Sequence, residues 1–167
     1  MDKLLVLDLD ETLSHTVWSS KSKPNKYNLI FENSYYISFR PNLNEFLSYV
    51  FNEFEVGIFT SCTDDHVKFI LSNITDLNNF KFIWTFDKCF YGYDLESNTY
   101  CNFKKLEKVS SSFNYNLKDI LIIDDKPITA KFNYENLIPI RPFFDDDNDI
   151  ELLKVVTYLD KIKRNRK

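Results

Sequence analysis

Short, uninterrupted runs of apolar residues recur along the chain, and each stops at polar or acidic residues. Leu4–Leu7, Phe54–Phe59 and Ile120–Ile123 show the pattern most clearly. Runs of this length without alternation are typical of strands that are covered on both faces, as in a parallel sheet. Phe80–Phe86 and Leu137–Ile140 are two weaker strand candidates of the same kind.

Stretches with helical periodicity separate these runs. We expect helices from Pro41 to about Phe51, over Asp64–Ser72, over Lys104–Ser112, and from a capping box at Asn148 and Glu151 to about Ile162. Strands that alternate with helices predict an α/β fold: a doubly wound, mostly parallel central sheet with helices on both faces.

Two further stretches look like small insertions into this pattern. Tyr27–Phe31 and Tyr35–Phe39 are rich in aromatic residues and are separated by three polar residues, which predicts a β-hairpin. Residues 87–103 are expected to be irregular or hairpin-like. The sequence shows no repeat and no low-complexity linker, so we predict a single domain over residues 1–167 with a basic tail at residues 161–167.

Composition narrows the class of protein. Aromatic residues make up 17% of the 167 residues, which excludes a disordered chain. The chain has only two glycines, so a glycine-rich phosphate-binding loop is excluded. The three cysteines form no CxxC pair, which argues against a zinc cluster or a disulfide framework. The net charge of −4 disfavours nucleic acid as a partner.

No long apolar segment lies near the start of the sequence. Leu4–Leu7 is too short for a signal peptide or a membrane span. We therefore expect an intracellular protein of the nucleus or cytoplasm, without membrane association.

Acidic and hydroxyl side chains follow three of the expected strands. Asp8 and Asp10 come after the first, Thr60 after the second, and Asp124 and Asp125 at the end of the third. Because the carboxyl ends of parallel strands meet at one edge of the sheet, these oxygens should lie together. Clustered carboxylates repel one another unless a cation or a proton compensates them, so the pattern predicts a Mg²⁺ site.

Other residues near these positions have simpler interpretations. Cys62 lacks the basic surroundings of a reactive thiolate and is expected to be a small apolar neighbour. His15 is expected to be packed or hydrogen-bonded. His66 is expected to be an exposed helical residue, although it is close enough to Thr60 to line the cleft.

Several motifs, in the right order, resemble those of haloacid dehalogenase-type phosphatases, and more narrowly the small phosphatases that act on the C-terminal domain (CTD) of RNA polymerase II. Asp8 begins DLDETL, which matches the nucleophile motif of that family. The remaining similarities are His15 after that motif, Arg40-Pro41 with Glu45-Phe46-Leu47, Phe59-Thr60-Ser61, Lys104-Lys105-Leu106, Ile123 to Pro127, and Phe144 to Leu152.

The resemblance implies a role for each matching residue. Asp8 would be the nucleophile that forms an aspartyl-phosphate, and Asp10 the general acid and base. Thr12 would orient these acids. The metal ligands would be Asp8, the backbone carbonyl of Asp10, and Asp125, and Asp124 would support the site by pairing with a lysine.

The resemblance also implies how substrate is held. Thr60, Ser61 and Lys104 would contact the phosphoryl group. Lys105 is the alternative to Lys104, because the local register is ambiguous. Trp18 matches an aromatic residue that lines a substrate pocket in the small CTD phosphatases, although it could equally be a core residue.

The short segments between the motifs leave no room for a large cap, so we expect an open cleft that suits a phosphorylated protein or peptide segment, such as an RNA polymerase II CTD-like repeat. Together these features predict a Mg²⁺-dependent phosphoserine/phosphothreonine protein phosphatase. Two alternatives stay open: the same chemistry on another phosphate ester, such as a nucleic-acid 3′ end or a small molecule, and a catalytically silent binding module of the same fold.

Overall fold

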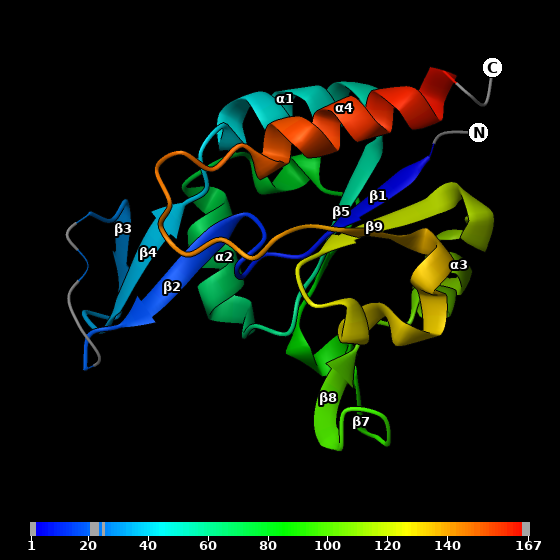
Figure 1. The fold of residues 1–167 in the computed structure, drawn as a ribbon, viewed down its shortest axis with the longest axis horizontal. Coiled ribbons are helices and arrows are strands. Elements are labelled where there is room, and N and C mark those ends of the chain that lie inside the picture. Colours follow the sequence, from blue (N-terminus) through cyan, green and yellow to red (C-terminus); the bar gives the residue numbers. More distant parts are fainter. Residues whose placement is uncertain (1–2, 21–23, 25, 165–167) are drawn as a thin grey trace.

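The fold is organised around one five-stranded parallel sheet, as the computed structural model shows for residues 3–20, 24 and 26–164 (Figure 1). Its strands, in spatial order, are β10 (Leu137–Pro139), β9 (Ile120–Asp124), β1 (Leu4–Leu7), β5 (Glu55–Phe59) and β6 (Ile83–Trp84). The chain passes from β1 to β5 and β6 on one side, and then returns to place β9 and β10 on the other. The predicted doubly wound α/β fold is therefore confirmed.

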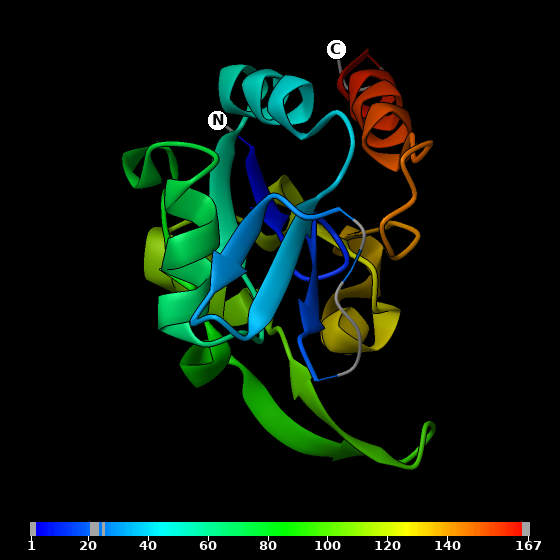
Figure 2. The same ribbon diagram turned by 90° about the vertical axis from the view of Figure 1, so that its left-hand side faces the viewer.

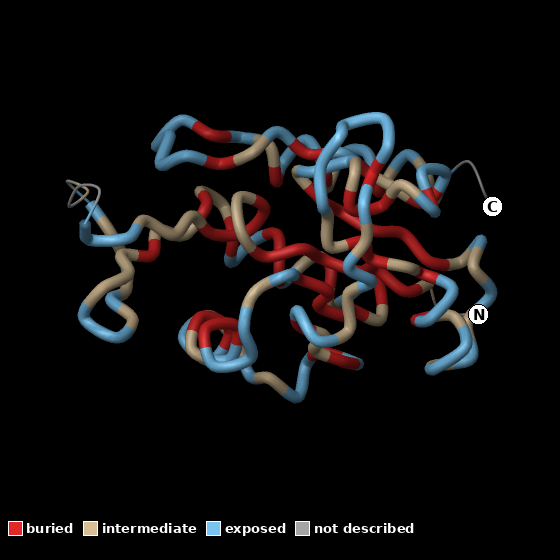
Figure 3. Tube along the Cα trace, turned by 90° about the horizontal axis from the view of Figure 1, so that it is seen from below, coloured by how far each residue is buried: buried red, intermediate tan, exposed pale blue. Residues whose placement is uncertain are grey.

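Helices cover both faces of this sheet. The helices are α1 (Leu43–Glu53), α2 (Asp64–Ser72), α3 (Leu106–Phe113) and α4 (Glu151–Arg164). Side chains of β1 alternate between two apolar clusters: Leu5 and Leu7 pack with α1, α2 and α4, whereas Leu4 and Val6 pack with α3. Burial of both faces explains why the strand sequences are continuously apolar. Figure 3 shows the buried strands running through the middle of the molecule.

Two small antiparallel sheets are added to this core. The first has the order β2 (Ser14–Trp18), β4 (Tyr35–Phe39) and β3 (Leu29–Phe31), and it contains the hairpin predicted from the aromatic runs. The second is the hairpin of β7 (Phe90–Asp94) and β8 (Thr99–Phe103), which reaches out from the body of the molecule (Figure 2). Lys131 holds this hairpin through ion pairs with Asp94 and Glu96.

Two details at the C-terminal helix differ from expectation. The cap of α4 is supplied by Asp149, whose Oδ1 accepts a hydrogen bond of 2.9 Å from the backbone N–H of Glu151, and not by the predicted Asn148. Arg40 pairs with the same Asp149 carboxylate. The predicted basic tail starts within the helix, because α4 continues to Arg164 and Lys163 pairs with Glu53. Residues 165–167 lie outside the described residues.

No helix in the described part of the chain is both long and apolar enough to cross a membrane.

Candidate active site

The candidate site lies where the strand order of the central sheet reverses. Asp8 directly follows β1, and Asp124 ends the neighbouring strand β9. The connections that leave these two strands run to opposite sides of the sheet, and in folds of this kind the ligand crevice is expected outside the carboxyl ends of such strands. The parallel register pairs Leu7 with Ile123, so the two acids come to the same level of that crevice.

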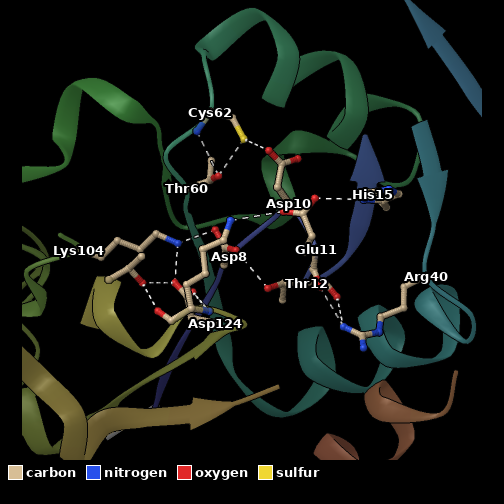
Figure 4. A network of polar contacts seen from close by, with 12 residues as sticks. Asp8, Asp10, Glu11, Thr12, His15, Arg40, Thr60, Cys62, Lys104 and Asp124 are labelled. Carbon is tan, nitrogen blue, oxygen red and sulfur yellow. Dashed lines mark hydrogen bonds and ion pairs between the residues drawn. The ribbon is translucent and has the colours of Figure 1, made fainter. Parts of the chain in front are cut away.

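A buried lysine joins these two acids. Lys104 Nζ lies 2.5 Å from Asp8 Oδ1 and 2.6 Å from Asp124 Oδ2 (Figure 4). All three side chains are almost fully buried. The backbone N–H of Lys104 donates a hydrogen bond of 2.7 Å to the carbonyl oxygen of Thr129, which fixes the lysine at the start of the α3 segment.

The pKa values of Lys104 and Asp8 depend on each other and on Asp124. Burial alone would lower the pKa of Lys104, but attraction to Asp8 and Asp124 outweighs burial and raises that pKa above its ordinary value. Burial raises the pKa of Asp8 to about 7, with Lys104 opposing the shift and Asp124 adding to it. One lysine therefore compensates the neighbouring carboxylates only in part.

Hydroxyl and backbone groups hold the two acids in position. Thr12 donates a hydrogen bond of 3.1 Å from Oγ1 to Asp8 Oδ2. Asp124 Oδ2 also accepts from Thr129 Oγ1 at 2.7 Å, and its Oδ1 accepts from the backbone N–H of Lys126 at 2.8 Å. Both oxygens of Asp124 are thus occupied by protein donors.

The geometry also fits a hard divalent cation. One carboxylate oxygen from each of Asp8, Asp124 and Asp125 lies within 4.8 Å of the others. Asp125 Oδ1 is buried and has no hydrogen-bond partner in the described structure, and burial raises the pKa of Asp125. A buried carboxylate oxygen without a donor is costly unless a cation or proton satisfies it. Oxygen ligands of this kind suit Mg²⁺.

Asp10 turns toward the end of β5 and not toward Lys104 (Figure 4). Its Oδ2 accepts a hydrogen bond of 2.7 Å from the thiol of Cys62, while its Oδ1 is buried without a partner among the described residues. Thr60 is 1% exposed, and its Oγ1 contacts Cys62 through both Sγ, at 3.2 Å, and the backbone N–H, at 3.3 Å.

Cys62 packs against the main apolar cluster, as expected, but its thiol has a polar partner that the sequence did not predict. Burial, together with the negative charge of Asp10, strongly raises the pKa of the Cys62 thiol and keeps its proton in place. The thiol acts as a hydrogen-bond donor because the loop after β5 directs it at Asp10. The sequence carries no signal for this contact, since the two residues are far apart along the chain.

A buried arginine supports the loop that carries the acids. Arg40 Nη1 donates to the carbonyl oxygens of Thr12 at 3.0 Å and Glu11 at 3.3 Å, and its other nitrogens pair with Asp149 at 2.8 and 2.9 Å. Glu11 adopts a left-handed backbone conformation with a φ of 56°, which forms the turn between Asp10 and Thr12. The sequence placed Arg40 in a motif but indicated no role for it. Its ion pair with Asp149 could not be predicted, because the two residues are far apart along the chain.

The structure also places three other residues predicted for the site: Lys105, Ser61 and Trp18. Lys105 Nζ lies 3.7 Å from the centre of the Phe90 ring, whereas Lys104 pairs with Asp8 and Asp124. Ser61 and Trp18 line a cavity of about 800 Å³ beside Asp10, and Trp18 is 52% exposed, which excludes a core role.

His66 lines the same cavity, but the expectation that it is exposed is wrong. Its side chain is only 9% exposed, since it packs against the rings of Phe31 and Tyr35 from the small sheet. His15 is hydrogen-bonded to Glu11 at 3.1 Å, which agrees with its expected structural role.

Comparison with known proteins identifies the family. The family model described as NLI interacting factor-like phosphatase matches residues 3–167. The chain belongs to this phosphatase family. It is 35% identical over 162 residues to the CTD small phosphatase-like protein 2 of Dictyostelium discoideum, a match that covers 95% of this chain and 27% of that protein. It is 31% identical over 181 aligned positions to the putative CTD phosphatase-like protein 355R of Invertebrate iridescent virus 3, with 96% of this chain and 97% of that protein covered.

Solved structures share the fold of this chain. The RNA polymerase II CTD phosphatase Fcp1 of fission yeast, bound to beryllium fluoride, superposes with a TM-score of 0.63 at 21% identity, over 99% of this chain and 52% of that one. An uncharacterised protein from Listeria monocytogenes superposes with a TM-score of 0.64 at 16% identity, over 97% and 99% of the two chains. The resemblance stated from the motifs is thereby confirmed at the level of family and fold, whereas the individual residue roles stay predictions.

Proposed function

We propose that this chain is a Mg²⁺-dependent phosphoserine/phosphothreonine protein phosphatase that acts through an aspartyl-phosphate on Asp8. The observation that supports this most is the arrangement of Asp8: a buried carboxylate at the switch point of the sheet, held by Lys104 and Thr12, with Asp10 two residues further on. The names of the CTD small phosphatase-like relative and of the RNA polymerase II CTD phosphatase Fcp1, which shares the fold, favour a phosphorylated protein segment as substrate.

The proposed reaction has two steps. In the first, an oxygen of Asp8 forms a bond to phosphorus, the bond from phosphorus to the seryl or threonyl oxygen breaks, and Asp10 gives its proton to the departing oxygen. In the second, water attacks the phosphorus of the aspartyl-phosphate while Asp10 takes up a proton, which releases phosphate and restores Asp8. Lys104 and Thr60 would stabilise the charge on the phosphoryl oxygens.

Asp8, the backbone carbonyl of Asp10, and Asp125 would hold the cation. Asp124 would be a supporting residue that is held in place by Lys104, Thr129 and the backbone N–H of Lys126. When bound, Mg²⁺ would neutralise negative charge at the phosphoryl group.

Replacing the nucleophile tests the proposal. Asp8→Asn should abolish hydrolysis of a phosphoserine peptide in the presence of Mg²⁺ while the far-ultraviolet circular dichroism of the protein is retained. Parallel assays with a 3′-phosphorylated oligonucleotide and an aryl phosphate identify the substrate class. Full activity in the Asp8→Asn variant would contradict the nucleophile assignment, and no activity of the unmodified protein on any substrate would favour a silent binding module.

A further inference from the structure

The cavity beside Asp10 has an aromatic wall. Trp18 of β2 lies directly opposite Tyr35 of β4, and Tyr35 lies directly opposite Phe31 of β3. Residues that are directly opposite one another on antiparallel strands point to the same face of a sheet. The three rings therefore form one row across the small sheet, and all three line the cavity.

The position of this wall is fixed by α2. His66 packs on the rings of Phe31 and Tyr35, with centroids 5.2 and 6.1 Å away, and its Nε2 lies 3.3 Å from Thr16 Oγ1 of β2. Burial lowers the pKa of His66, against the opposing influence of Asp10 and Glu32, which favours the neutral ring that packs as an aromatic group. The cavity is thus a built feature, closed on one side by the row of rings and on the other by the start of α2.

The charge of the lining is negative. Asp10, Glu32 and Asp65 contribute carboxylates, and no lysine or arginine is among the lining residues in the described part of the chain. Glu32 and Asp65 are exposed, and neither has an ion-pair partner among the described residues. His15 also lines the cavity, but it is already hydrogen-bonded to Glu11.

Aromatic faces combined with unpaired carboxylates favour one kind of occupant. A lysine or arginine side chain can lay its aliphatic stem and cationic head against aromatic rings while the charge is attracted to nearby acids. A purely apolar side chain would instead remove water from Glu32 and Asp65 without supplying a partner, which disfavours it.

Because the cavity begins at Asp10, two residues from the nucleophile, its occupant must be close in sequence to the phosphorylated residue. We propose that this cavity binds a lysine or arginine side chain next to the phosphoserine or phosphothreonine, so that the preferred substrates are phosphoproteins with an adjacent basic residue. This inference rests on the function proposed above.

Matched phosphopeptides test the preference. The peptides differ only in the residue before or after the phosphoserine, which is lysine, proline, norleucine or glutamate, and kcat/KM is measured for each with Mg²⁺. In at least one of the two positions, lysine should exceed norleucine by about tenfold and glutamate by more, with the advantage shrinking at high salt. Proline or norleucine equalling lysine in both positions would overturn the inference.

Variants of the cavity test its location. Glu32→Gln and Asp65→Asn, combined, should reduce the preference for lysine over norleucine to within about twofold, since both neutral side chains keep their size. Asp64→Asn is the matched control: it removes a charge from the same turn of α2, but Asp64 pairs with Lys68 and does not line the cavity, so the preference should persist. If the double variant is poorly folded, the two single variants are compared with the control in the same assay. A preference that survives every loss of charge would overturn the assignment to this cavity.

Activity on an aryl phosphate separates this inference from the proposed function. Hydrolysis of the aryl phosphate and of all peptides at similar rates would overturn the inference alone. No hydrolysis of any phosphate ester would overturn the proposed function and the inference with it.

Discussion

The crevice at the end of the central sheet and the cavity under the small sheet lie side by side, yet they are built in opposite ways. In the crevice, Lys104 pairs with both Asp8 and Asp124, and all three side chains are buried. In the cavity, Glu32 and Asp65 are exposed and have no ion-pair partner among the residues that the structure describes, and Trp18 is half exposed. Asp10 belongs to both regions.

The difference separates two tasks. Charges that are paired and buried cannot rearrange cheaply, which keeps the reacting groups in place. Charges that are exposed and unpaired are free to meet a ligand, at little cost to the folded state. Substitutions in the crevice should therefore have large effects on both stability and chemistry, and substitutions in the cavity small effects that are confined to substrate binding.

Removing the positive charge of Lys104 should have the largest effect on stability and activity. Lys104→Met leaves Asp8 and Asp124 buried beside each other without their shared partner, so we expect a loss of about 3–5 kcal/mol in the free energy of unfolding and at least a hundredfold loss of kcat. Urea denaturation and steady-state kinetics measure the two quantities.

Lys105→Met is the matched control for that variant. Lys105 lies against the rings of Phe90 and Phe132, away from the acids, so stability should change by no more than about 1 kcal/mol. Equal effects of the two substitutions would contradict the distinction between these lysines.

The raised pKa of Asp8 should make stability depend on pH. The pKa is about 7 in the folded protein against an ordinary value of 3.8, so between these values the folded protein holds more protons than the unfolded chain. The contribution of Asp8 is therefore most favourable below about pH 4, and stability should fall as the pH rises from about 4 to 7.

Asp8→Asn isolates this effect. Without Mg²⁺, the difference in unfolding free energy between the variant and the original protein should grow with pH over that range. Added Mg²⁺ should stabilise the original protein more than the variant, and increasingly so at higher pH, because a ligand carboxylate must be deprotonated. The same pH dependence in both proteins would contradict the shifted pKa of Asp8.

Asp10 lies in both regions, and removing its hydrogen bond from the thiol of Cys62 should have an intermediate effect on kcat. Cys62→Ala removes the donor to Asp10 Oδ2 and should reduce kcat about three- to tenfold, whereas Cys62→Ser supplies another donor and should retain most of the activity. Comparable losses in both variants would show that the hydrogen bond has no part in positioning Asp10.

Substitution of Trp18, in the exposed aromatic wall of the cavity, should have the smallest effect on stability. Trp18→Ala should change the free energy of unfolding by less than about 1 kcal/mol, because the side chain is 52% exposed. It should raise KM for a phosphopeptide about fivefold with little change in kcat. Thermal unfolding and peptide kinetics distinguish these outcomes, and a severe loss of stability would assign Trp18 to the core.

Local sequence patterns were enough to predict the strands that carry the acids of the crevice. The apolar runs before Asp8 and Asp124 identified both strands, and parallel topology then placed the acids together. The boundaries of α2 were also predicted as observed, since helical periodicity begins directly at Asp64.

Contacts between distant segments could not be read from the sequence in the same way. The thiol of Cys62 reaches Asp10 across 52 positions, and Arg40 reaches Asp149 across 109. His66 was expected to be an exposed helical residue, but the rings of Phe31 and Tyr35 from the small sheet cover it. Such pairings depend on how separate elements pack, which no local pattern records.

The most direct test of the central claim is to locate the phosphoryl group on the protein during turnover. The enzyme is mixed with a phosphoserine peptide and Mg²⁺, quenched in acid within milliseconds, digested, and analysed by mass spectrometry. We expect one phosphoryl group on Asp8, which disappears as turnover ends and is absent from the Asp8→Asn variant. Steady hydrolysis of the peptide with no phosphoryl group on Asp8 at any time, or with the group on another residue, would contradict the account.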